Sequence, residues 1–154
     1  MEHSDRRGGA LVGELISAFL GTICFAVIYR ADRHHTLLCG LNGVITWFVY
    51  SLIVLSGHSE ITACFVASFC LTVIARLLSV MRKAPATVFL VTGVFVLVPG
   101  AGLYYTIFNA FMNRPTEAMF HCILTLKTAL AIAFGIVMAY VLPQKLFVWK
   151  KGKR

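Results

Sequence analysis

The chain has 154 residues, of which 59% are hydrophobic and 13% are charged, and its formal net charge is +8. A mean hydropathy of +0.84 excludes an ordinary soluble domain. The basic residues are dispersed among the ends of apolar stretches, which argues against a nucleic-acid-binding face and for contact with anionic membrane lipids. The five cysteines show no CxxC spacing, so we expect neither a metal nor a cofactor.

Five apolar stretches are each long enough to cross a bilayer whose hydrocarbon core is about 30 Å thick. They cover residues 10–29, 36–56, 61–80, 86–112 and 119–142. The short links between them leave no room for a soluble domain. The pattern therefore predicts an all-α polytopic membrane protein with five transmembrane helices, forming a single membrane domain over residues 1–154.

The distribution of charge between the links predicts an orientation. With five crossings, the first link, the third link and the C-terminus share one side. That side carries Arg30, Arg33, Arg82, Lys83 and the basic tail of residues 143–154. Because basic residues gather on the cytoplasmic side, we expect the N-terminus outside and the C-terminus in the cytoplasm of a cell membrane protein. Three basic residues on the other side oppose this trend: Arg6, Arg7 and Arg114.

Glu14 is an ionisable residue inside the first span. Such residues are rare in spans and often functional, so we predict a proton-coupling or gating group. A carboxylate that merely reaches the interface, or that a neighbouring residue satisfies, is the alternative. The following link contains Asp32, His34 and His35. Adjacent residues on a helix do not share a face, so we favour a polar interfacial link over a metal site.

The second and third spans carry features of helix packing. Gly40, Asn42 and Gly43 are suited to close contact between helices and to a hydrogen bond across them. Ser59 precedes the third span as an N-cap residue. Arg76 lies about one turn from the end of the same span, where its side chain is expected to reach the interface.

The stretch 97–105, Leu-Val-Pro-Gly-Ala-Gly-Leu-Tyr-Tyr, interrupts the fourth span. Pro99 lacks a backbone donor, while Gly100 and Gly102 add backbone freedom. We therefore predict that this helix breaks at Pro99–Gly100, near mid-bilayer. A second half-helix over about 103–112 would then point its free N–H groups and positive dipole end at the interior, where an anion could bind.

Side-chain donors accompany the predicted break. We assign Tyr104, Tyr105 and Asn109, together with the broken segment, to a substrate-binding site. Irregular backbone inside a membrane survives only where protein or a watery cavity shelters it. A kinked helix whose break simply packs against a neighbour is the alternative interpretation.

Lys127 lies about 12 Å into the fifth span, counted from Met119. A lysine near mid-span costs roughly 2.5–3.5 kcal/mol, so we expect it to face the bundle interior and to contact Glu14 or a carboxylate substrate. Thr125 is assigned to the same site, and Thr128 is a further hydroxyl contact. A purely structural ion pair, or a side chain that reaches the membrane interface, is the alternative. Farther along, small residues suited to close helix contact recur every four positions: Ala131, Gly135 and Ala139.

Two motifs carry a resemblance to a known family. Residues 82–89, Arg-Lys-Ala-Pro-Ala-Thr-Val-Phe, and residues 96–104, Val-Leu-Val-Pro-Gly-Ala-Gly-Leu-Tyr, resemble the small membrane half of the threonine/serine exporter (ThrE) family, the YjjB-like type. The link 31–35, leading into 37–43, is similar to the family's first cytoplasmic link. The resemblance extends over nearly the whole chain.

The resemblance implies export of small carboxylate-bearing metabolites, namely threonine and serine in one branch and dicarboxylates such as succinate in another. It also implies a larger, YjjP-like membrane half as partner, encoded separately or fused. By position, Pro99, Gly100, Gly102 and Tyr104 match the broken-helix motif of the family. Lys127 matches no family pattern, so its assignment depends on the physical argument alone.

We therefore predict a subunit of a secondary exporter, coupled to protons, which works in a homo- or hetero-oligomer and is not an enzyme. No Walker motif indicates use of ATP. The alternatives are a non-transporting membrane scaffold, a passive channel, and an intramembrane enzyme. The enzyme would depend on His121 and Cys122, which diverge by about 100° on a helix and therefore cannot act together.

Overall fold

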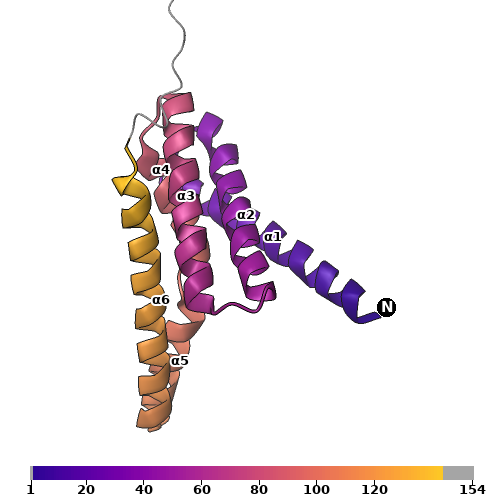
Figure 1. Ribbon diagram of the computed structural model, residues 1–154, viewed down its shortest axis with the longest axis vertical. Coiled ribbons are helices and arrows are strands. Elements are labelled where there is room, and N and C mark those ends of the chain that lie inside the picture. Colours follow the sequence, from indigo (N-terminus) through magenta and orange to yellow (C-terminus); the bar gives the residue numbers. More distant parts are fainter. Residues whose placement is uncertain (1, 144–154) are drawn as a thin grey trace, which may run out of the picture.

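The computed structural model describes residues 2–143, without the side chains of residues 2–10, Arg33 and His34, and the regular structure of this part is entirely helical. The elements are α1 (Glu2–Ile28), α2 (Arg33–Leu55), α3 (Glu60–Arg82), α4 (Ala86–Val94), the short 3₁₀ helix η1 (Phe95–Leu97), α5 (Gly100–Phe111) and α6 (Pro115–Val141). The helices α2, α3 and α6 lie side by side, whereas α1 leans away from them toward its N-terminus (Figure 1). Beyond Pro143, the predicted basic tail lies outside the described residues.

Four of the described helices, α1, α2, α3 and α6, are long and apolar enough to cross a membrane. The segments Ala86–Leu97 and Gly100–Phe111 pass the same test together and are bent by 49° at the break between them. The chain thus has five crossings when this bent pair counts as one. The prediction of an all-helical membrane protein with a broken fourth span is confirmed.

The helix ends follow local sequence chemistry. Ser59 caps α3 as predicted, because its side chain accepts a hydrogen bond of 3.3 Å from the Thr62 N–H. Pro85 occupies the N-cap position of α4. Pro115 lies in the first turn of α6, where a helix tolerates a missing N–H, so α6 begins four residues before the predicted boundary at residue 119.

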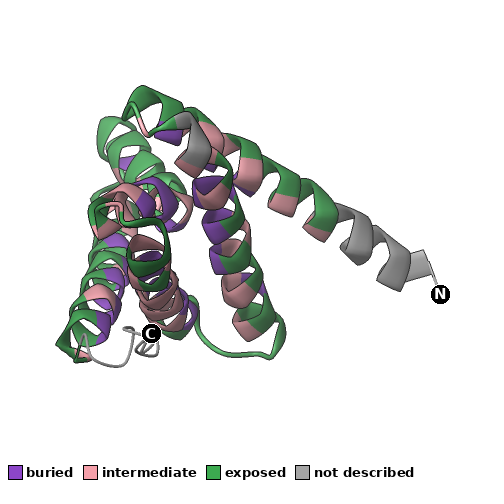
Figure 2. Ribbon diagram, turned by 90° about the horizontal axis from the view of Figure 1, so that it is seen from above, coloured by how far each residue is buried: buried purple, intermediate pink, exposed green. Residues whose placement is uncertain are grey.

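Small residues bring the helices into close contact. A Cβ added to Gly135 of α6 would collide with the side chain of Ser68 and the backbone of Phe65, both in α3. A Cβ on Gly43 of α2 would collide with Thr22 of α1. The predicted packing faces are therefore confirmed at these positions. Figure 2 shows the buried residues on the helix sides that face one another and the exposed residues on the outside.

Arg76 joins α3 to the end of α6. Its Nη1 donates hydrogen bonds to the carbonyl oxygens of Ala139 at 2.6 Å and Leu142 at 2.8 Å, and its guanidinium lies 5.5 Å from the ring centroid of Tyr140. The last carbonyl groups of a helix have no partner within it. Arg76 therefore caps α6, a role beyond the predicted approach to the membrane interface.

The helices α3 and α6 are parallel but displaced along their axes. Gly135 lies against Phe65–Phe69, and Arg76 lies at the end of α6, so the start of α3 is level with the middle of α6. The hairpin of α5 and the first half of α6 consequently extends past the α2–α3 loop (Figure 1). The break is thus level with the middle of α6 but with one end of α3, and its depth in the bilayer stays a prediction.

Candidate substrate cavity at the helix break

A cavity of about 470 Å³ lies at the break between η1 and α5. Its walls come from α2, α3, the broken segment and α6. Five residues that the sequence assigned to substrate binding line it together: Pro99, Gly100, Gly102, Tyr105 and Thr125. The fold therefore joins the broken segment to the hydroxyl-bearing face of the last helix.

The backbone at the break presents donors to this cavity. Pro99, with φ −77° and ψ 61°, is not helical. The N–H of Gly100 bonds to a carbonyl two residues back at 2.7 Å, and the N–H of Leu103 bonds to the Pro99 carbonyl at 3.2 Å. Between them, the N–H groups of Ala101 and Gly102 lie in the first turn of α5, where a helix supplies no acceptor. The positive end of the α5 dipole therefore faces the cavity.

Thr125 adds a hydroxyl beside this helix end. Its side chain is 8% exposed, and its Oγ1 has no hydrogen-bond partner among the described residues. The same atom lies so close to Gly102 that an added Cβ would collide with it. By contrast, the Thr128 hydroxyl donates to the Leu124 carbonyl at 2.9 Å, as threonines in helices commonly do. Thr125 lines the cavity. Its unpartnered hydroxyl packs against the first turn of α5, and a buried hydroxyl without a partner is costly.

Other polar side chains of the cavity were not assigned to it from the sequence. Glu60, the first residue of α3, brings a carboxylate. His121 stacks on Tyr105 with 5.3 Å between ring centroids, and Trp47 lies 5.0 Å from Tyr50 by the same measure. One cavity is therefore bordered by a positive helix end, a carboxylate and aromatic rings.

One of these omissions had a signal in the sequence. His121, Thr125 and Thr128 recur at the spacing i, i+4, i+7, which places them on one face of a helix. Glu60 had no such signal, because the sequence places it in the link before the third span. It reaches the cavity only because α6 is displaced along α3. Its contact with the break is a product of tertiary structure.

Two predicted site residues lie outside the cavity wall. Tyr104 is 60% exposed on α5. Asn109 is buried, but its Nδ2 donates to the Tyr105 carbonyl at 2.9 Å within the same helix. Neither side chain lines the cavity at the break. Their assignment to substrate binding stays a prediction.

Lys127 does not face the interior of the bundle, and this expectation is wrong for the single chain. Its side chain is exposed on the outer side of α6. Residues two positions apart on a helix point in nearly opposite directions. Because Thr125 lines the cavity, Lys127 cannot lie on that same face of α6. The described side chains form no contact between Lys127 and Glu14, the partner considered from the sequence.

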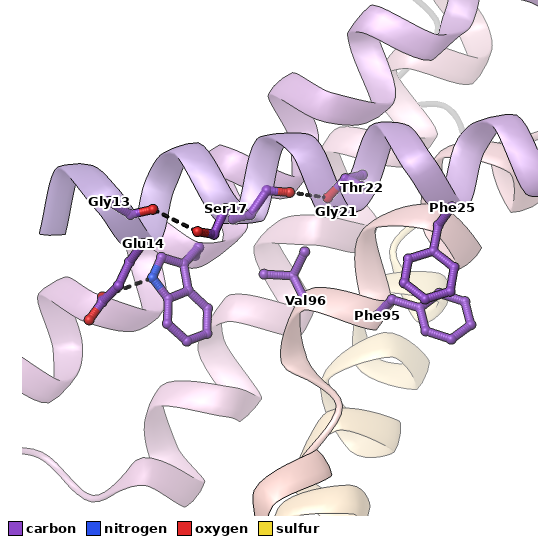
Figure 3. A pocket seen from close by; sticks show the side chains of 10 residues that line it. Gly13, Glu14, Ser17, Gly21, Thr22, Phe25, Phe95 and Val96 are labelled. Atoms are coloured by element: carbon purple, nitrogen blue, oxygen red, sulfur yellow. Dashed lines mark hydrogen bonds between the residues drawn. The ribbon is translucent and has the colours of Figure 1, made fainter. Parts of the chain in front are cut away.

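Glu14 borders a second cavity, of about 650 Å³, between α1, α2 and η1 (Figure 3). Its Oε2 accepts a hydrogen bond of 3.1 Å from Nε1 of Trp47. Phe25 and Phe95 stack at the other end, with ring centroids 3.9 Å apart. Trp47 lines both cavities, so it connects the surroundings of Glu14 to the break.

The chemistry of the cavity at the break suits reversible binding of a small molecule with charged ends. Its donors are backbone N–H groups and hydroxyls, and the carboxylate of Glu60 is its negatively charged acceptor. Among the side chains that the structure describes, no three His, Cys, Asp or Glu residues are grouped as ligands of a metal ion would be.

Comparisons with known proteins agree with the motifs at the break. The family model described as "Threonine/Serine exporter, ThrE" matches residues 14–142. Over 130 residues the chain is 25% identical to a Mycobacterium tuberculosis (strain ATCC 25618 / H37Rv) protein named "Probable threonine/serine exporter". That alignment covers 84% of this chain and 25% of the relative, so the chain spans about a quarter of the relative's length. No solved structure matches the chain.

Proposed function

The chain belongs to the threonine/serine exporter family, and we propose that it supplies the substrate cavity of a secondary exporter of small amino acids. Membership in this family supports an exporter role, and the apolar helices indicate a multi-pass membrane protein. The observation that carries the proposal is the unpartnered, buried hydroxyl of Thr125 beside the uncapped start of α5. It is a donor that the chain itself does not satisfy, in a residue that lines the cavity.

The carboxylate of the substrate is proposed to bind at the start of α5. Helix N-termini attract anions through their free N–H groups and their positive dipole end. The N–H groups of Ala101 and Gly102 supply the backbone donors, and the Thr125 hydroxyl supplies a third. A hydrogen bond to a charged group contributes about 1.5–3 kcal/mol, so three such donors would favour a carboxylate over its neutral analogue.

Glu60 distinguishes between the substrate classes that the family resemblance left open. A carboxylate in the cavity wall attracts the ammonium group of an α-amino acid and repels the second carboxylate of succinate. A cavity of about 470 Å³ has room for an amino acid together with water. We therefore propose threonine and serine, in preference to dicarboxylates, as the substrates of this chain.

The chain is proposed to act with a larger membrane half of the same family. Its match to about a quarter of a longer relative supports this arrangement. The proposed setting is the cell membrane, with the N-terminus outside and the C-terminus in the cytoplasm, because basic residues gather in the first and third links. Proton coupling through Glu14 remains part of the proposal.

The test is the efflux of labelled threonine and of labelled succinate from cells in which variants replace the native chain. Glu60→Gln is expected to slow threonine efflux about tenfold or more, since an interaction with a charged group is lost. It is not expected to slow succinate efflux, since a repulsion is removed. Glu117→Gln is the control, because Glu117 lies outside the cavity and pairs with Arg114 at 3.6 Å.

Unchanged threonine efflux in Glu60→Gln, with normal amounts of protein in the membrane, would contradict the proposed substrate class. If substitutions of Thr125 also left efflux unchanged, the non-transporting scaffold would become the better description of this chain.

A further inference from the structure

Glu14 and Lys127 are the sole ionised side chains in their apolar stretches, residues 10–29 and 119–142. Both are exposed. They lie on α1 and α6, which are on opposite sides of the bundle (Figure 1). An exposed charge in a membrane span is expensive unless it is paired, so each of these residues calls for a partner of opposite charge.

The surroundings of Glu14 leave room for a helix. Gly13, Ser17 and Gly21 recur every four residues along the same cavity of about 650 Å³. A Cβ added at Gly13 or at Gly21 would meet nothing within 4 Å. Small residues at this spacing let a second helix approach closely. We call this cavity, between α1, α2 and η1, the α1 groove (Figure 3).

The surroundings of Lys127 form a ridge that matches such a groove. Apolar side chains follow one face of α6 at helical spacing, and all are at least 45% exposed: Ile123, Leu130, Phe134 and Met138. Lys127 lies on this same face. We call these residues the α6 ridge. The single chain therefore carries an apolar ridge with one cation and an apolar groove with one anion.

Glu14 is connected through Trp47 to the cavity at the break. Trp47, which donates to Glu14, also lines the cavity at the break beside Leu124 and Thr128. Those two residues flank Lys127 in the sequence. A contact between neighbouring copies about an axis along the membrane normal therefore relies on the long side chain of Lys127 to reach the level of Glu14.

We propose that the α6 ridge of one copy of this chain docks into the α1 groove of a second copy, where Lys127 pairs with Glu14. Groove and ridge lie on opposite sides of the bundle, so the contact is head-to-tail and closes into a ring when the rotation between copies permits. Lipid is a poorer occupant, because an anionic headgroup suits Lys127 but is repelled from the groove at Glu14, whereas a second copy satisfies both charges. The proposed substrate cavity adjoins the α1 groove at Trp47 and Val96, which line both, and includes none of the residues of the α6 ridge.

The first test is disulfide crosslinking between two differently tagged copies that are expressed together. One copy carries Glu14→Cys, the other carries Lys127→Cys, and the exposed native Cys24 and Cys122 are replaced by Ser in both. We expect a disulfide that joins the two tags. Val12→Cys is the matched control, because Val12 is 56% exposed but points away from Glu14 on the same helix.

The second test is charge reversal, read as the oligomeric fraction in mild detergent. Glu14→Lys and Lys127→Glu are each expected to reduce that fraction several-fold, and the double variant is expected to restore it. If a reversed variant does not fold, Glu14→Gln and Lys127→Met replace it, and each is expected to reduce the fraction.

Three results would overturn the proposal. The first is crosslinking between the tags no stronger than in the Val12→Cys control. The second is a disulfide formed within one chain when both cysteines are on the same copy, with none between copies. The third is a disulfide crosslink from the cysteine at position 127 to a different membrane protein.

Discussion

The hydroxyl oxygen of Thr125 lies against the α-carbon of Gly102, across the contact between α6 and α5. The absence of a side chain at position 102 is what lets this hydroxyl reach the first turn of α5. The relationship joins a side-chain donor to the positive end of a half-helix, and it places both in the wall of one cavity. Predictions about this cavity follow from it.

Gly102→Ala is expected to reduce threonine efflux strongly. The added Cβ would collide with the Thr125 hydroxyl, so either α5 or the threonine side chain must move and the donor set is lost. Gly100→Ala is the matched control, because a Cβ there meets nothing within 4 Å. Efflux from loaded cells measures both. Equal activity of the two variants would contradict the role of this close contact.

Thr125→Val is expected to weaken threonine binding without destabilising the fold. Valine has nearly the same shape, and the hydroxyl it replaces has no partner among the described residues, so no internal hydrogen bond is lost. A lost hydrogen bond of about 1.5–3 kcal/mol to a carboxylate corresponds to at least a tenfold loss of affinity.

The binding measurement for Thr125→Val uses the fluorescence of Trp47, which lines the cavity. Trp149, the other tryptophan of the chain, is replaced by Phe in both the variant and its reference. Thermal unfolding in detergent measures stability in parallel. A variant that binds threonine as tightly as the reference would remove Thr125 from the site.

Arg76→Met is expected to destabilise the fold. Two carbonyl oxygens at the end of α6 would lose a charged donor, at a cost of about 1.5–3 kcal/mol. The midpoint of thermal unfolding in detergent should fall accordingly. Arg114→Gln is the comparison, since the pair of Arg114 and Glu117 is exposed and contributes little. An equal midpoint for both variants would argue against the capping role of Arg76.

Gly135→Ala is expected to disturb the contact between α3 and α6. The added Cβ would meet the backbone of Phe65 and the hydroxyl of Ser68, and backbone cannot move aside cheaply. Overpacking of this kind costs about 1–3 kcal/mol. Reduced yield of monodisperse protein and a lower unfolding midpoint are the expected readouts. Full stability in this variant would show that the helices separate more easily than their packing indicates.

The fold could be predicted from the sequence because its determinants are local. Apolar stretches of bilayer length, a proline with two glycines in one of them, and a serine before another were sufficient to predict the helices, the break and the cap at Ser59. These features act through backbone chemistry within a few residues. They therefore do not depend on how the helices pack.

The residues of the cavity could be predicted only in part, since some of them come together only through the packing of the helices. Tyr105 and Thr125, which the sequence grouped with the break, line the cavity. Lys127 was placed with Thr125 although helical geometry separates them by about 200°. Glu60 joins the cavity because α6 is displaced along α3, and no pattern within either helix encodes that displacement. Sequence periodicity predicts which residues share a face of a helix. It does not predict which residues of two neighbouring helices lie at the same level.

The displacement also makes the chain sensitive to the thickness of its bilayer. The 23 residues of α3 are about 35 Å long and the 27 residues of α6 about 40 Å, and their ends do not coincide. A hydrocarbon layer about 30 Å thick can match one of the two helices when they stand upright, whereas a tilt brings both closer to a match. Efflux measured across a series of lipid acyl-chain lengths should therefore pass through a maximum, at the thickness where tilt and hydrophobic mismatch balance.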